Sequence, residues 1–228
     1  MLPPIPEKLL RIDESTVSQH FSLRDSDQCL YIWEYTAGKR YDFSPTNQLI
    51  SNLKIKPGSL AKSPKRNFYK EQAIDHAAQG LLHFLPRAYV EQRATFVPVP
   101  GSKIAGDADY DPRMLHVLQR ALEAWSAWSA DIRPMLELTH SIPADHETTD
   151  RIPYDELLEV SRLSDVSGKP LRPVVVVVDD VLNSGKHFKV AQTLISDQAP
   201  TVEIRGLFVA RCIRDTVSPV EFPIADDV

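Results

Sequence analysis

The chain has few cysteines and no long apolar run, the features typical of disulfide-rich secreted proteins, structural zinc sites and membrane proteins. Its 228 residues include two cysteines, Cys29 and Cys212, which lie far apart with no Cys-x-x-Cys spacing. A disulfide framework and a structural zinc site are therefore not expected, and both thiols are predicted to be reduced. No apolar run approaches the roughly 20 residues that span a bilayer, and the first residues lack the charged-then-apolar order of a signal peptide. We expect a cytoplasmic protein with no membrane contact.

The chain also lacks the excess of positive charge on which sequence-independent nucleic-acid binding depends. Its formal net charge is −5 and its pI is near 5.8, so direct binding of nucleic acid is not expected, and only local basic patches stay open. Glycine is scarce, with 8 residues against 18 prolines, which indicates stiff loops and short elements. The composition is otherwise that of a globular protein, and the length predicts a single domain over residues 1–228.

The most informative stretch covers residues 173–189. Five consecutive valines, residues 174–178, suit a strand that is buried on both faces, as in a parallel sheet covered by helices. Two carboxylates, Asp179 and Asp180, come next, and a short polar turn leads into apolar residues at helical spacing. Ligands of open α/β sheets bind beyond the carboxyl ends of strands, and a helix start offers N–H groups to phosphate. The pattern predicts a phosphate-binding site.

Three known motifs could account for this stretch, and spacing excludes the first two, a P-loop and a receiver domain. A P-loop requires Gly-x-x-x-x-Gly-Lys-Ser/Thr, but His187 follows Gly185-Lys186, and Asp180 occupies the position of the first glycine. A receiver domain begins with its acidic strand, and the 48 residues after Asp180 are too few for the remainder. A plain turn that caps the next helix is a further interpretation, because aspartate is common at caps. The two adjacent acids and the glycine at the matching offset argue against it.

The stretch resembles the motif with which type I phosphoribosyltransferases bind phosphoribosyl pyrophosphate (PRPP). That motif has a hydrophobic run, two acids and a small-residue loop around a glycine. The resemblance implies that Asp179 and Asp180 bind the ribose hydroxyls of the ligand, which is PRPP or a nucleotide phosphate. It also implies that they coordinate Mg²⁺. It also implies that the following loop cradles the 5-phosphate. The family usually has hydroxyls where Asn183 and His187 stand, but an amide and a ring nitrogen also donate hydrogen bonds. The implied PRPP-binding residues are Asp179, Asp180, Val181, Asn183, Ser184, Gly185, Lys186 and His187.

A second segment carries a signal of the same kind. Residues 95–99 predict a strand, and Pro98 and Pro100 indicate that it finishes at the edge of the sheet or in a loop. The sequence Pro-Val-Pro-Gly-Ser-Lys resembles the pyrophosphate loop of ComF-like phosphoribosyltransferases. The resemblance implies that Ser102 and Lys103 contact pyrophosphate and that Lys103 is catalytic together with the two acids.

A helix is predicted directly after this loop, over residues 113–128. Asp111 and Pro112 form a suitable cap and first-turn pair, so Asp111 is interpreted as structural. Arg113 stands where ComF-like proteins have an arginine after their pyrophosphate loop. We expect Arg113 either to touch pyrophosphate or to pair with Asp109.

The amino-terminal third is expected to form an arm and a small hood over residues 1–70, followed by a phosphoribosyltransferase core over residues 71–228. Residues 29–35 predict a strand, and Ser44 with Pro45 predicts a helix start. This order, followed by a basic run that begins at Lys54, resembles the start of ComF-like proteins, without their usual cysteine-rich zinc module. The basic run is either a solvated loop or a group of cations that faces an anionic ligand or partner.

Residues 139–152 have few apolar side chains and no periodicity, which in a compact domain is typical of disorder or of a functional lid. Type I phosphoribosyltransferases have a mobile loop between their pyrophosphate loop and their PRPP motif. The resemblance implies that this segment closes over the site and excludes water. His140, His146 and Arg151 are the residues that such a lid could contribute.

The sequence thus predicts an α/β protein with a mainly parallel sheet and helices on both faces, the type I phosphoribosyltransferase fold. Parallel strands end at one edge of the sheet, so Lys103 and the acidic pair should emerge side by side, with both carboxylates pointing to solvent. The loop of residues 183–187 should surround an anion-sized hollow at a helix start.

Two functions are expected from the resemblance. One is Mg²⁺-dependent transfer of a phosphoribosyl group to an unidentified acceptor with release of pyrophosphate. The other is non-catalytic sensing of PRPP or a nucleotide by a homodimer or by a subunit of a larger complex. A role in DNA uptake, repair or phage defence rests on the ComF resemblance alone.

Overall fold

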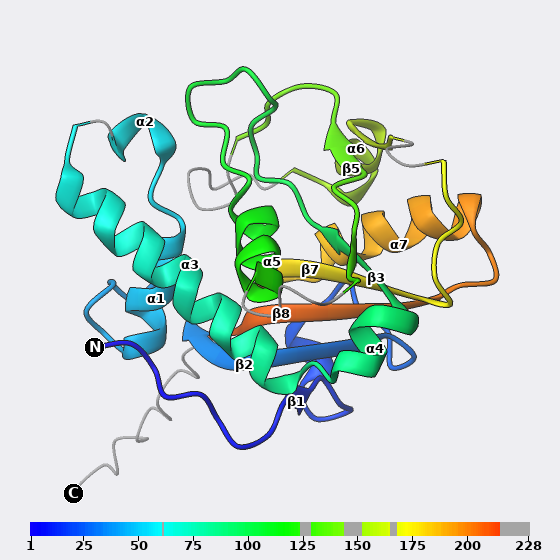
Figure 1. The fold of residues 1–228 in the computed structure, drawn as a ribbon, viewed down its shortest axis with the longest axis horizontal. Helices are drawn as coiled ribbons and strands as arrows, with labels where there is room; N and C mark the ends of the chain where they lie inside the picture. The colour runs from blue at the N-terminus through cyan, green and yellow to red at the C-terminus, as the bar shows by residue number, and fades with distance from the viewer. Residues whose placement is uncertain (61, 124–128, 144–151, 165–167, 215–228) are drawn as a thin grey trace, which may run out of the picture.

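A computed structural model gives the fold and describes residues 1–60, 62–123, 129–143, 152–164 and 168–214 (Figure 1). Its centre is a six-stranded sheet with the order β1-β2-β8-β7-β3-β4. The neighbours from β2 through β4 are parallel, and β1 at the edge runs antiparallel to β2. The strands are Leu10–Arg11 (β1), Gln28–Thr36 (β2), Ala94–Pro98 (β3), Asp131–Ile132 (β4), Val174–Leu182 (β7) and Glu203–Ile213 (β8).

Helices cover both faces of this sheet. One face packs against α1, α3 and α5, and the other packs against α7. The α/β architecture with a mainly parallel sheet between two helical layers is therefore confirmed. The helices are Val17–Gln19 (η1, a 3-10 turn), Pro45–Leu53 (α1), Pro57–Leu60 (α2), Pro64–Phe84 (α3), Arg87–Gln92 (α4), Arg113–Glu123 (α5), Tyr154–Glu159 (α6) and Lys186–Gln198 (α7).

Strand β7 lies inside the sheet because its valines fill both faces. The even-numbered valines pack with α1, α3 and α5, the odd-numbered ones pack with α7, and all five are at most 3% exposed. The sequence had indicated that this strand ends at the two acids. It continues instead to Leu182, in register with β8. Strand β3 ends at Pro98, opposite Val178. Asp179 and Asp180 therefore project past β3 while β8 still holds them.

The amino-terminal third belongs to the same sheet. Strand β2 pairs with β8 along its length, so residues of the segment 1–70 form part of the central sheet. The helix start predicted at Ser44 is confirmed, because the Ser44 hydroxyl accepts a hydrogen bond from the Asn47 N–H at 3.0 Å. Of the helix predicted over residues 113–128, the described part ends at Glu123.

A second, small unit not foreseen from the sequence lies above α7 in Figure 1. Strands β5 (Leu136–Leu138) and β6 (Ser161–Leu163) form an antiparallel pair, and α6 leads into β6. Their apolar side chains gather around Ile142, Leu157 and Val160 and contact Val190 of α7.

Two further expectations concern the chain as a whole. Cys29 and Cys212 form no disulfide, as predicted, and both are buried. Within the described ranges, no helix has both the length and the apolar character that a membrane span requires.

Helix α3 approaches β2 closely at Gly80, where an added Cβ would lie 2.5 Å from the Cη2 atom of Trp33. Alanine is a better helix former by about 1 kcal/mol, but overpacking a core costs about 1–3 kcal/mol. We therefore expect Gly80→Ala to lower the free energy of unfolding in urea. The matched control is Gln79→Ala at an exposed neighbour, which should change it by less than about 0.5 kcal/mol. A Gly80→Ala variant at least as stable as the original would show that the helix can move away from Trp33.

Candidate functional site

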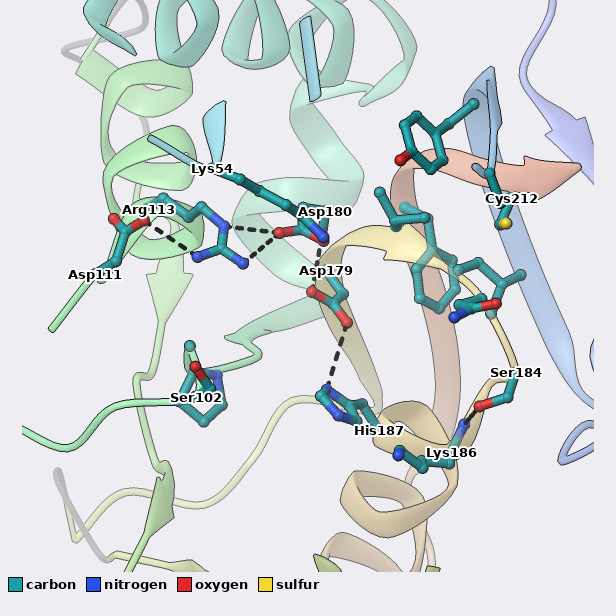
Figure 2. Close-up of a pocket in the computed structure, with 18 of the residues that line it drawn as sticks. Lys54, Ser102, Asp111, Arg113, Asp179, Asp180, Ser184, Lys186, His187 and Cys212 are labelled. Carbon is teal, nitrogen blue, oxygen red and sulfur yellow. Dashed lines mark hydrogen bonds and ion pairs between the residues drawn. The ribbon is translucent and has the colours of Figure 1, made fainter. Parts of the chain in front are cut away.

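A cleft of about 600 Å³ opens at the carboxyl ends of β3 and β7 (Figure 2). It gathers segments from distant parts of the sequence, including residues 100–103, 179–188 and the end of β2 with the turn after it. Lys103 lies in the same cleft as the acidic pair, as the parallel topology predicted. The predicted site residues that line it are Ser102, Lys103, Arg113, Asp179, Asp180, Val181, Asn183, Ser184, Gly185, Lys186 and His187.

The two-residue period of β7 directs the adjacent carboxylates to opposite faces of the sheet. Asp180 is in phase with the even-numbered valines, on the side of α1, α3 and α5, and Asp179 is in phase with the odd-numbered ones, on the side of α7. The side chain of Asp180 is 5% exposed and that of Asp179 is 14% exposed. The prediction that both carboxylates point to solvent is therefore wrong.

Asp180 is held between two cations. Its Oδ1 lies 3.0 Å from Lys54 Nζ, and its Oδ2 accepts a hydrogen bond of 2.7 Å from Arg113 Nε. Burial alone would raise the pKa of Asp180, but the charges of Arg113 and Lys54 outweigh it and hold the pKa well below its usual value. Asp180 is thus ionised at any physiological pH.

Asp179 has a different environment. Its Oδ1 accepts a hydrogen bond of 2.7 Å from the Asp180 N–H, and its Oδ2 lies 4.0 Å from His187 Nδ1 on α7. Burial, and then repulsion from ionised Asp180, raises the pKa of Asp179 to about 7. The two neighbours therefore differ near neutral pH, where Asp180 is fully ionised and Asp179 is only partly ionised.

Arg113 extends the charge network into the protein. Its Nη1 donates to Asp111 Oδ2 at 3.1 Å, and the same oxygen accepts from Lys70 Nζ at 2.8 Å. Lys70 Nζ also donates to the carbonyls of Leu53 and Ile55, at 2.9 and 2.8 Å, which fixes the end of α1. Asp111 is structural, as interpreted from the sequence. The predicted pairing of Arg113 with Asp109 is replaced by its contacts with Asp111 and Asp180.

The turn from β7 into α7 is shaped by one glycine. Gly185 has φ +86° and ψ 0°, a left-handed conformation that glycine adopts without strain, and α7 begins at the next residue. The first N–H groups of a helix have no partner within the helix and carry its positive dipole end. Ser184 Oγ accepts from the Lys186 N–H at 3.3 Å. Lys186 lines the cleft, and its Nζ donates to the carbonyl of Ile152 at 2.7 Å.

Residues before β2 support this turn from behind, which the sequence did not reveal. The His20 ring contacts the Asn183 carbonyl through Nδ1, and the Ser22 N–H donates to the Ser184 carbonyl at 2.9 Å. The side chain of Leu23 fills the space beside Gly185, where an added Cβ would lie 2.6 Å from it. Any larger residue at position 185 would therefore push the loop away from its support.

The loop of residues 100–103 is fixed to the opposite side of the cleft. The Ile142 N–H donates to the Ser102 carbonyl at 2.8 Å, and Lys103 Nζ donates to the Ile142 carbonyl at 3.1 Å. At Gly101 an added Cβ would lie 3.1 Å from the Asp111 carbonyl oxygen. The loop with Ser102 and Lys103 thus packs beside the charge network and against the beginning of the predicted lid.

The predicted lid is described only at its ends. Residues 139–143 and Ile152 contact the two loops of the cleft as given above, whereas residues 144–151, with His146 and Arg151, lie outside the described residues. His140 is exposed and does not line the cleft.

The basic run from Lys54 onward fits both of its interpretations. Lys54 and Lys56 line the cleft, whereas Lys62, Lys65 and Arg66 are exposed on the molecular surface.

The donor atoms of the cleft bear on the expected Mg²⁺. Within the part of the chain that the structure describes, no group of three His, Cys, Asp or Glu side chains forms a metal cluster. Mg²⁺ is often held by one or two carboxylates together with substrate phosphates and water. Asp179 could supply such a carboxylate, while both oxygens of Asp180 are engaged by cations.

Comparison with protein-family models and with curated proteins gives no match to this chain.

The two acids should respond differently to loss of charge. Asp180→Asn leaves Lys54 and Arg113 short of a buried partner, so we expect it to reduce the free energy of unfolding by about 3–5 kcal/mol. The matched control, Asp179→Asn, removes a repulsion and should leave stability unchanged or higher at neutral pH. Urea denaturation followed by circular dichroism measures both. Equal losses in the two variants would contradict the division of roles.

The raised pKa of Asp179 predicts a particular pH dependence of stability. Its pKa is 3.8 in an ordinary setting and about 7 in the folded protein, so between these values the folded state binds a proton that the unfolded chain does not. Stability should therefore fall as pH rises from about 4 to about 7 and then level off. We expect the difference in unfolding free energy between the original protein and Asp179→Asn to follow this course. A difference that is constant or grows across this range would exclude a raised pKa.

Proposed function

We propose that the protein binds PRPP and transfers its phosphoribosyl group to an acceptor, with release of pyrophosphate. The observation that carries the proposal is the order of three features in one cleft. A phosphate loop at a helix start, an acidic residue and a second loop with a lysine follow one another, as the 5-phosphate, ribose and pyrophosphate do in PRPP. Figure 2 has Asp179 and His187 between Ser184 on one side and Ser102 on the other.

In this reaction the protein would contribute mainly by positioning the reactants and by stabilising the charge that develops. The bond between ribose C1 and pyrophosphate breaks, pyrophosphate leaves with the electron pair, and a lone pair of the acceptor forms the new bond while the acceptor releases a proton. Lys103 would stabilise the departing charge, and Asp179 would accept a hydrogen bond from a ribose hydroxyl. Asp180 is better suited to positioning, since its two oxygens are already engaged by Lys54 and Arg113.

Magnesium, when bound, would neutralise part of the pyrophosphate charge. The donor set suits an ion that arrives with the phosphates of the substrate and contacts Asp179, rather than an ion held by the protein alone.

A second candidate is a PRPP or nucleotide sensor without turnover, acting as a homodimer or within a larger complex. Asn183 and His187, in place of the usual hydroxyls of the loop, favour it, as does the engagement of Asp180 by two cations. The same phosphate loop would accept a nucleotide phosphate.

Calorimetry with PRPP, in the presence and absence of Mg²⁺, tests the proposal, and a pyrophosphate-release assay with candidate acceptors separates the two functions. We expect Lys103→Ala to lower turnover by about 10²-fold and to change PRPP affinity much less, because charge develops on pyrophosphate as the bond breaks. The control is Arg66→Ala, an exposed cation outside the cleft. Absence of PRPP binding would refute phosphoribosyl transfer, absence of binding of both PRPP and nucleotides would refute both candidates, and PRPP binding without turnover would favour the sensor.

A further inference from the structure

The turn between β7 and α7 is held by a segment that does not itself line the cleft. The His20 ring contacts the Asn183 carbonyl through Nδ1, and the Ser22 N–H donates to the Ser184 carbonyl at 2.9 Å. Residues 183–187 line the cleft, whereas residues 20–23 do not. Two successive carbonyls of the turn are therefore directed toward a segment outside the cleft.

The direction of each carbonyl fixes the direction of one N–H group, because the two point opposite ways across a planar trans peptide. The Asn183 carbonyl shares a peptide unit with the Ser184 N–H, and the Ser184 carbonyl shares the next one with the Gly185 N–H. Within the ranges that the structure describes, neither N–H donates a hydrogen bond to another backbone group. Both point away from residues 20–22, into the cleft that the turn lines.

The state of the His20 ring is determined by its surroundings. The residue is fully buried, and this burial lowers the pKa of His20; the hydrogen bond to Asn183 opposes the effect and the charge of Arg211 adds to it. The ring is thus neutral at pH 7 and has one N–H. Because a carbonyl can only accept, that proton is on Nδ1. Nε2 has no hydrogen-bond partner among the described residues, so the ring is oriented by its bond to Asn183.

The segment behind the turn is itself fixed to α7. Asp27, just before β2, accepts hydrogen bonds from Lys189 Nζ at 3.0 Å and from Gln192 Nε2 at 3.2 Å. The side chain of Leu23 fills the space beside Gly185, where an added Cβ would lie 2.6 Å from it. The turn is therefore ordered before a ligand arrives, which reduces the entropy that binding has to overcome.

We propose that His20 is a positioning residue for a phosphate monoester, because it holds the Asn183 carbonyl away from the cleft and so turns the Ser184 and Gly185 N–H groups toward the phosphate. Without the donor on His20, the Asn183 carbonyl can turn into the cleft, where its negative end repels an anion. The identity of the ligand as a sugar phosphate rests on the proposed function. The orientation of the turn rests on its contacts with residues 20–23.

Calorimetry with ribose 5-phosphate and with inorganic phosphate tests this role. His20→Leu removes the donor and keeps a buried side chain, so the affinity for both probes should fall about 10-fold, the effect expected of one lost hydrogen bond. His20→Asn keeps an N–H donor at the position of Nδ1 and should restore most of the affinity. A side chain that only filled space would not be rescued in this way.

Backbone amide resonances report the orientation of the turn directly. In ¹⁵N–¹H spectra of the original protein, the proton signals of Ser184 and Gly185 should move downfield on saturation with ribose 5-phosphate, as expected of N–H groups that donate to an anion. In His20→Leu the shift of the Ser184 signal should be lost.

A second variant and a stability control assign the effect to the turn. Leu23→Ala removes the packing beside Gly185 and should also weaken the binding of ribose 5-phosphate, by a smaller factor. Gly80→Ala, which is expected to lower stability through α3, should leave this affinity unchanged. If His20→Leu fails to fold, the comparison of Leu23→Ala with Gly80→Ala decides the question.

The outcomes separate this inference from the proposed function. Unchanged affinity in a folded His20→Leu, equal losses in His20→Leu and His20→Asn, an equal loss in Gly80→Ala, or no binding of either probe by the original protein would overturn the inference, even if PRPP binds. A loss specific to His20→Leu in a protein that releases no pyrophosphate from PRPP would support the inference and refute phosphoribosyl transfer.

Discussion

The buried carboxylate of Asp180 is the constraint on which the arrangement of the cleft depends. A charge removed from water costs several kcal/mol unless it is paired, and the pairing draws Lys54 and Arg113 toward the end of β7. Arg113 also binds Asp111, which in turn holds Lys70 of α3. Three helices are thereby fixed relative to one strand.

Because side chains alternate between the two faces of a strand, Asp179 and Asp180 lie in different environments and have different properties. Asp180 faces the cations and stays ionised, whereas Asp179 faces α7 and its pKa is raised. Burial, and then the ionised form of Asp180, raises the pKa of Asp179, whereas Arg113 and Lys54 keep the pKa of Asp180 low. A pair on one face would compete for the same cations. On opposite faces, one acid can build the site while the other remains available to a ligand.

Local patterns made part of this structure predictable. The valine run fixed the identity of β7, Gly185-Lys186 fixed the start of α7, and parallel topology placed Lys103 near the acids. Contacts between distant segments were not predictable. The length of β7 depends on pairing with β8, and the pairing of Arg113 with Asp180 joins residues 67 positions apart. His20, which contacts the turn between β7 and α7 at the Asn183 carbonyl, comes from a segment without any periodicity that would mark it.

The charge balance of the cleft assigns different tasks to its cations. Arg113 and Lys54 neutralise Asp180, and their withdrawal to a ligand would leave a buried carboxylate unpaired, at a cost of several kcal/mol. They are therefore better suited to permanent attachment than to contact with a substrate that comes and goes. Lys103, whose ammonium contacts a neutral carbonyl, faces no such cost when it turns toward an anion. Negative charge that arrives with a ligand should thus be met by Lys103, in the loop of residues 100–103.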